Sequence, residues 1–130
     1  MHKRLQFKTE NGQTLTEFAI VLPILALLLF GVIQFGITFN NYITLTDAVR
    51  AGARKGAVGR RVSNPQAAVQ TSVRNAATDL KSSSLQITVN STWAQGSDVT
   101  VTATYPYSIN LLGVVVKSGR LSSSTTERVE

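Results

Sequence analysis

The chain has 130 residues, a formal net charge of +6 at pH 7, no cysteine and one histidine. The length corresponds to about one domain, and the lack of cysteine excludes disulfide frameworks, thiol catalysis and cysteine-based zinc sites. The histidine, His2, lies in the N-terminal tail, and the seven acidic residues show no spacing typical of a general acid and base. We therefore expect a protein that is not an enzyme, with no catalytic residue, no metal ligand and no cofactor.

A long apolar run predicts a membrane span. Residues 18–33 include no charged or amide side chain, and if Gln34 and Thr38 are tolerated the run reaches Phe39. Twenty-two residues at ~1.5 Å each extend roughly 33 Å, enough for a bilayer core of about 30 Å. The sixteen apolar residues alone extend about 24 Å and would also suit a buried helix. Because an aromatic and amide cluster begins at Phe39, as at a membrane interface, the pattern favours a span over about 18–39.

The run lacks the features of a removable secretory signal. A secretory apolar segment has about 7–15 residues and ends at a small-x-small site, but the first such triplet, residues 51–53, lies well beyond the run. The segment is therefore expected to remain, and Pro23 inside it is expected to kink the helix or to open its hydrogen-bond ladder. Because cytoplasmic flanks carry an excess of lysine and arginine, the basic N-terminal flank predicts a cytoplasmic N-terminus and an extracytoplasmic C-terminal domain. The basic residues beyond the run oppose this orientation.

The residues that lead into the run form a recognisable motif. A short basic leader ends at Gly12, and four residues separate this glycine from the pair Glu17-Phe18. This order resembles the prepilin signature of type IV pilins and pseudopilins, and the Glu-Phe pair is similar to that of the Flp or Tad branch. The resemblance implies that residues 1–12 are a leader removed by a prepilin peptidase between Gly12 and Gln13. Glu17 would then be the fifth mature residue and would act in assembly.

Physical chemistry gives Glu17 two interpretations. A carboxylate that enters a bilayer is costly unless it has a partner, and cleavage would create an α-amine on Gln13 that neutralises Glu17 of a neighbouring subunit. Glu17 also fits an ordinary first-turn residue favoured by the helix dipole. The spacing from Thr14 to Glu17 even matches a capping box.

The helical pattern continues beyond the apolar run. Apolar residues recur three or four positions apart, at Tyr42, Leu45, Val49 and Ala53. We expect one long helix over 13–60. Ala48, Gly52 and Gly56 form a stripe of small residues, which indicates either the close approach of another backbone or a fraying helix end.

The remaining residues, 61–130, predict a small α+β domain. Asn64 and Pro65 are typical of a helix start, and the apolar spacing carries this second helix to near Lys81. Alternating apolar residues then predict three antiparallel strands, over 85–90, 99–107 and 120–129. The expected fold is therefore α+β and pilin-like: a long N-terminal transmembrane helix, a second helix and a three-stranded sheet. Because so short a domain has a marginal core of its own, we expect the sheet to pack on the second half of the long helix.

This order extends the resemblance to TadE-like minor pseudopilins of the Tad (tight adherence) pilus system. The similar stretches are "EFAIVLPILALLLFGVIQFG" and "DAVRAGARKGAVG", with a looser likeness in "ERVE". The resemblance implies a role in assembling or priming an adhesive pilus. It also implies several partners: a prepilin peptidase, other Tad or Flp pilins, and the inner-membrane assembly platform, in a homo- or hetero-oligomer. The chain would lie in the cytoplasmic membrane or in surface pili. A TadF-type protein stays an alternative.

Two further alternatives come from charge and topology. A basic segment follows the span and is a candidate contact for lipid or an anionic partner: Arg50, Arg54, Lys55, Arg60 and Arg61. Loss of the leader, with three basic residues and one acidic residue, lowers the formal charge from +6 to +4, but no aromatic residues interleave the basic ones as single-strand binding would require. Nucleic acid is therefore disfavoured. The alternative of another class is an unprocessed, signal-anchored extracytoplasmic binding domain, which intact mass would distinguish.

Overall fold

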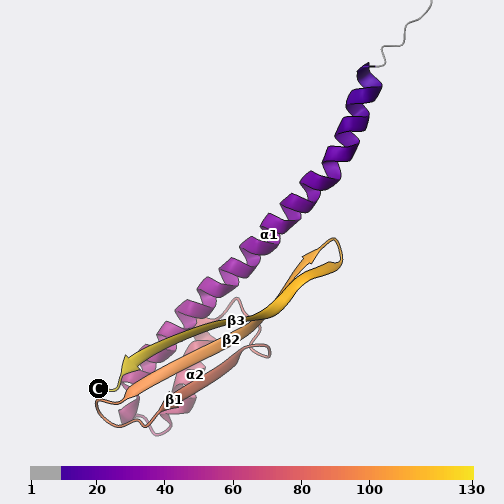
Figure 1. The fold of residues 1–130 in the computed structure, drawn as a ribbon. Helices are drawn as coiled ribbons and strands as arrows, with labels where there is room; N and C mark the ends of the chain where they lie inside the picture. Colours follow the sequence, from indigo (N-terminus) through magenta and orange to yellow (C-terminus); the bar gives the residue numbers. More distant parts are fainter. Residues whose placement is uncertain (1–9) are drawn as a thin grey trace, which may run out of the picture.

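The computed structural model describes residues 10–130, and most of the predicted leader lies outside the described residues. A long helix carries a small head at its C-terminal end (Figure 1). The elements in chain order are α1 (Glu10–Ala57), the 3-10 turn η1 (Gly59–Arg61), α2 (Pro65–Ala76), β1 (Gln86–Ser91), β2 (Asp98–Leu111) and β3 (Val114–Arg128). The predicted α+β fold, with two helices and a three-stranded antiparallel sheet, is confirmed.

Helix α1 is 48 residues long and begins earlier than the motif suggested. Because Glu10 is already helical, the segment from Thr14 to Glu17 lies inside α1, and the capping-box interpretation is wrong. The helix passes through Pro23 without interruption, and its axis bends in the N-terminal third (Figure 1). Since proline cannot donate an amide hydrogen bond to the preceding turn, we attribute this bend to Pro23.

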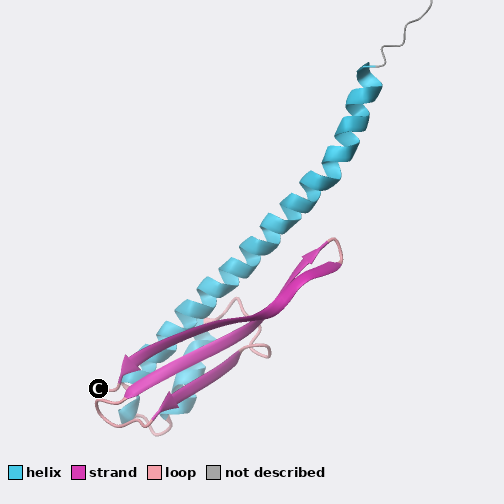
Figure 2. Cartoon of the chain, viewed as in Figure 1, coloured by secondary structure: helices cyan, strands magenta, loops and turns pink. Residues whose placement is uncertain are grey.

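The head has one layer of helix and one layer of sheet. The C-terminal half of α1 and the whole of α2 cover one face of the sheet (Figure 2). The core is drawn from both layers and consists of Leu45, Ala48, Val49, Ala53, Val69, Val73, Ala77, Leu80, Leu85, Val99, Val101, Ala103 and Val129. Four of these residues belong to α1, so the sheet packs on the long helix as expected. Burial of this shared surface holds the head on the helix that carries it.

Local signals fix the start of α2 but not its end. The Asn64 side chain accepts a hydrogen bond from the Ala67 amide at 3.1 Å, and Pro65 occupies the first turn, as predicted. The helix ends at Ala76 rather than near Lys81. Leu80 is nevertheless buried, because the turn after α2 returns it to the core. The apolar spacing therefore identified the core residue correctly and the helix end wrongly.

The sheet order is β1-β2-β3, with both pairs antiparallel. On its outer face, hydroxyl groups pair across β2 and β3, as in the 2.9 Å contact between Thr100 and Thr126. β2 and β3 are longer than predicted, and their hairpin extends beyond β1 alongside α1 (Figures 1 and 2). The turn residues Leu112 and Gly113 have φ values of 52° and 88°. Positive φ at both positions suits the right-handed twist of a two-residue hairpin turn.

Candidate functional site

The predicted cleavage and assembly motif lies on the exposed first turns of α1. The Gln13 side chain donates a hydrogen bond from Nε2 to Glu17 Oε1 at 3.2 Å, and Thr16 Oγ1 donates to the Gly12 carbonyl at 2.9 Å. A side chain added at Gly12 would meet no atom within 4 Å. The predicted scissile bond, between Gly12 and Gln13, is therefore helical and open to solvent in the uncut chain. Within residues 10–130 no lysine or arginine forms an ion pair with Glu17.

The stretch of α1 after this motif exposes a continuous apolar surface. Its large side chains are far more exposed than those of a soluble core helix, with 59% for Phe18 and 64% for Leu28. No residue in its most apolar window is buried, and this is the candidate membrane span in the described part of the chain. Because monomeric soluble proteins seldom expose apolar patches of this extent, the exposure favours a span over a buried core helix.

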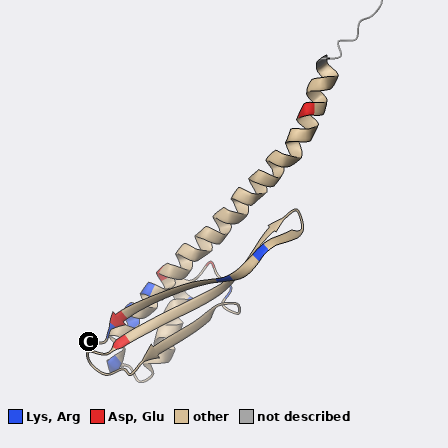
Figure 3. Ribbon diagram, viewed as in Figure 1, with Lys and Arg blue, Asp and Glu red and all other residues tan. Residues whose placement is uncertain are grey.

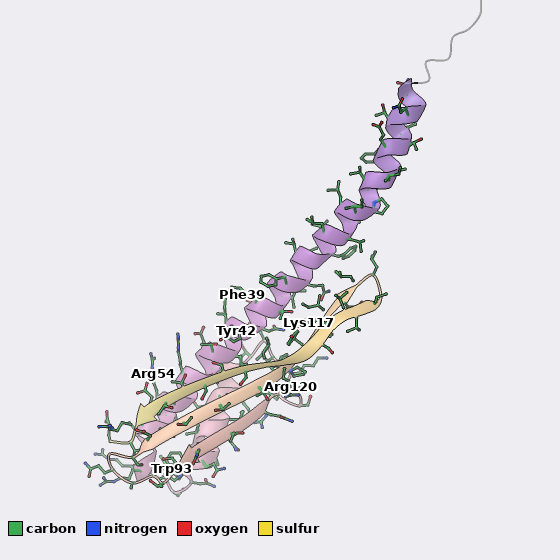
Figure 4. The ribbon with its side chains drawn as sticks, viewed as in Figure 1. Phe39, Tyr42, Arg54, Trp93, Lys117 and Arg120 are labelled. Atoms are coloured by element: carbon green, nitrogen blue, oxygen red, sulfur yellow. The ribbon has the colours of Figure 1, made fainter. Side chains whose placement is uncertain are left out.

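Charge is distributed unevenly along the helix. One acidic residue marks the N-terminal end, a long uncharged section follows, and basic residues gather around the head (Figure 3). In the basic segment, Arg50 pairs with Asp47 at 3.9 Å across an exposed helix turn, which contributes little to stability. Arg60 donates to Gln95 Oε1 at 2.8 Å and is tied to the turn between β1 and β2. Arg54 points away from the sheet into solvent (Figure 4).

The basic segment is divided between two consecutive elements. Arg54 and Lys55 are exposed on the last turns of α1, whereas Arg60 and Arg61 are exposed on η1. Arg50, the nearest to the span, follows Phe39 by eleven residues, about 16 Å along a helix axis. Because the headgroup layer on each side of a bilayer is only about 5–8 Å thick, this distance favours an anionic protein neighbour over lipid phosphate.

The stripe of small residues serves packing inside the head. A Cβ added at Gly52 would overlap Val73 Cγ2 of α2, and one added at Gly56 would lie 2.9 Å from Val99 Cγ2 of β2. Both α2 and the sheet therefore approach the α1 backbone at these glycines. This packing supports the interpretation of the stripe as a close contact, made here by side chains of α2 and the sheet rather than by another backbone. The stripe also reaches the end of the helix, since α1 ends at Ala57, one residue after Gly56.

A groove in the head has no feature of a catalytic centre among the residues that the structure describes. An open groove of ≈ 640 Å³ between α1 and α2 is lined by small and polar side chains, among them Ala51, Lys55 and Asn75. Among residues 10–130 no group of three or more histidine, cysteine or acidic side chains is placed to hold a metal ion.

One surface was not anticipated from the sequence. The tip of the β2–β3 hairpin carries exposed apolar residues, among them Leu112 and Val114. Leu111 Cδ2 lies 4.0 Å from the position of a Cβ added at Gly31, inside the apolar section of α1. The signal was present as an apolar "INLLGVVVK" segment around a glycine, but leucine is an unusual turn residue.

These features define a class of protein: an α+β head carried on one long, exposed, apolar helix that is a candidate membrane span. Residues 12–54 match the family model described as TadE-like protein. The predicted resemblance to TadE-like proteins is thus confirmed over this segment. No curated protein and no solved structure matches the chain.

Proposed function

We propose that the chain is a minor pseudopilin that helps to assemble or prime a Tad- or Flp-type adhesive pilus. The observation that carries this proposal is the family match over residues 12–54, which begins at Gly12 and includes Glu17 at the entrance of an exposed apolar helix. A prepilin peptidase cuts after Gly12, and the mature chain begins at Gln13. The partners are the peptidase, the other Tad or Flp pilins and the assembly platform of the cytoplasmic membrane.

The open surroundings of Gly12 support cleavage there. No atom lies within 4 Å of a Cβ added at this position, so the glycine is not required by packing in the chain itself. A requirement for glycine would then come from the peptidase, whose subsite has to admit the residue before the cut. The exposed Glu17 is available in the same way to a neighbouring subunit.

The test is a matched pair of leucine variants in a cell that expresses the Tad peptidase. Gly12→Leu should abolish processing, because the new side chain has to enter the peptidase subsite. Gly36→Leu is the control, since Gly36 lies on the same helix with equally open surroundings, and it should be processed normally. Intact mass of the membrane-extracted protein measures loss of residues 1–12. Retention of Met1 in the wild-type chain would instead support an unprocessed, signal-anchored protein.

The proposed topology places the N-terminus in the cytoplasm and the head outside. Protease added to intact spheroplasts should then degrade residues of the head, such as those of the exposed hairpin, before lysis. Protection of the head until lysis would reverse the topology and remove the pilus role.

A further inference from the structure

The tip of the β2–β3 hairpin is an apolar surface that lies beside the apolar section of α1. The hairpin tip consists of Leu111, Leu112, Gly113, Val114, Val115 and Val116. Four of its side chains are exposed, with 64% for Leu112, 66% for Val114, 57% for Val115 and 61% for Val116. Exposed valines lie on both faces of this short ribbon, and Asn110, the strand partner of Val115, is the polar side chain exposed beside them. Such a surface is expected to meet an apolar environment.

The fold places this tip beside the apolar section of α1 rather than beside the head. Leu111 Cδ2 lies 4.0 Å from a Cβ added at Gly31, and Gly31 precedes Phe39 by eight residues, about 12 Å along the helix. Gly31, Gln34 and Thr38 are half-buried and lie on one face of α1. Further along the helix, the same face includes the buried Leu45. The polar side chains of the run thus lie on the hairpin side of the helix, and the other sides are apolar.

Charge appears on the hairpin at the distance expected for a membrane interface. Lys117 is the first charged residue after the hairpin tip, and it lies four positions after Gly113, about 13 Å in an extended strand. Arg120 lies further from the tip, where β3 joins the three-stranded part of the sheet (Figure 4), and donates to the Ser84 carbonyl at 3.3 Å. An apolar tip followed by a lysine is the order that lets the ammonium group reach phosphate while the tip enters the lipid.

The turn itself favours a role for the exposed leucine. Leu112 adopts φ of 52°, a region in which a bulky residue is uncommon and asparagine, aspartate or glycine is usual. A leucine there adds strain to the hairpin and exposes an apolar side chain. Neither effect stabilises the head in water, so the residue favours an interaction outside the chain.

We propose that the hairpin tip inserts into the outer leaflet of the membrane that α1 crosses, with Lys117 at the level of the lipid phosphates. This inference rests on the span and orientation under the proposed function but not on the pilus role. The insertion is shallow, because beyond Thr104 the hairpin has no β1 partner and open strand edges are not tolerated in hydrocarbon. A depth of about 5–10 Å, as for other interfacial elements, moves the outer boundary of the span from Phe39 toward Gln34.

The test measures depth with spin labels on single cysteines, which the chain allows because it has none of its own. The full-length protein is reconstituted in liposomes of phosphatidylethanolamine and phosphatidylglycerol. Collisions with oxygen report lipid, and collisions with a nickel chelate report water. Leu112→Cys and Val114→Cys probe the hairpin tip, and the second retains the native turn residue. Thr92→Cys, exposed at the opposite end of the sheet, is the aqueous control, and Leu28→Cys probes the span.

The expected result is an oxygen-to-nickel collision ratio several-fold higher at both tip positions than at Thr92→Cys. A tip ratio equal to that of Thr92→Cys, with Leu28→Cys in lipid, would overturn the inference and leave the span and proposed function intact. Nickel access at Leu28→Cys would overturn the span as well. Protection of the tip that disappears at tenfold lower protein-to-lipid ratio would identify a second copy as the occupant and also overturn the inference.

Discussion

The contact between Gly52 and Val73 allows a quantitative test of how the head is attached to α1. Because a Cβ at position 52 would overlap Val73 Cγ2, Gly52→Ala forces α2 away from the helix, which typically costs about 1–3 kcal/mol. Alanine also raises helix stability by roughly 0.5–1 kcal/mol relative to glycine. The net expectation is that Gly52→Ala lowers the free energy of unfolding of the head by about 1 kcal/mol.

A second substitution separates overlap from other effects. Val73→Ala removes two buried methyl groups, worth about 0.8 kcal/mol each plus a cavity term, so it should cost about 2 kcal/mol alone. In the double variant the new methyl group at position 52 occupies part of the space that Val73 has vacated. The double variant should therefore be less destabilised than the sum of the single variants, by about 1 kcal/mol or more.

The assay is urea unfolding of the detergent-solubilised full-length chain, followed by the fluorescence of Trp93, its single tryptophan. Trp93 reports on the head because its Cζ3 lies 3.2 Å from a Cβ added at Gly59. Gly36→Ala, at an open position of α1, should leave this transition unchanged. Additivity of the two substitutions within about 0.5 kcal/mol, or stabilisation by Gly52→Ala, would refute close approach at this contact.

Two other substitutions test separate parts of the molecule. Asn64→Ala removes the side chain that accepts a hydrogen bond from the Ala67 amide, and it should lower the free energy of unfolding by about 1 kcal/mol in the same assay. Asn75→Ala, at an exposed position of the same helix, is its control. An equal effect of both substitutions would contradict the capping role. Glu17→Gln should still be inserted and processed but should lose most of its co-purification with other pilins, because under the proposed function its charge pairs with a neighbouring subunit. As a control, Asp47→Asn removes another exposed carboxylate of α1 and should co-purify with the other pilins normally. Unchanged co-purification of Glu17→Gln would show that Glu17 has no role in assembly.

The sequence predicted what periodicity and local chemistry determine. The apolar run, the Asn64 cap and the alternating strand residues each follow from a preference that acts over a few neighbouring residues. The end of α2 depends on tertiary packing, since Leu80 reaches the core from a turn. The same is true of the Gly52 stripe, whose two interpretations differ only in whether a partner such as Val73 lies opposite.

The hairpin tip shows a different limit of prediction. Its turn residue, Leu112, lacks the chemistry by which short hairpins are recognised, so the extension of both strands was missed. Its place beside Gly31 depends on the length of the two strands and on how the sheet packs against α1. The candidate motif at Gly12 and Glu17 was found from the sequence because it is local. The contact within it, in which the Gln13 side chain donates a hydrogen bond to Glu17 across one helical turn, was seen only in the structure.

The helical state of the uncut motif explains why processing would have to precede assembly. Because α1 already includes Glu10, the amides just after Gly12 lie inside a continuous helix and meet the carbonyls of the preceding turn. Cleavage removes those carbonyls and leaves free amides and an α-amine at Gln13, so the interior of a helix becomes a positive helix end. An uncut subunit would keep Glu17 but would offer its neighbours no α-amine at Gln13. Gly12→Leu should therefore lose co-purification as Glu17→Gln does, and combining the two should add no further loss. A larger loss in the double variant would mean that Glu17 acts through a partner other than the α-amine created by cleavage.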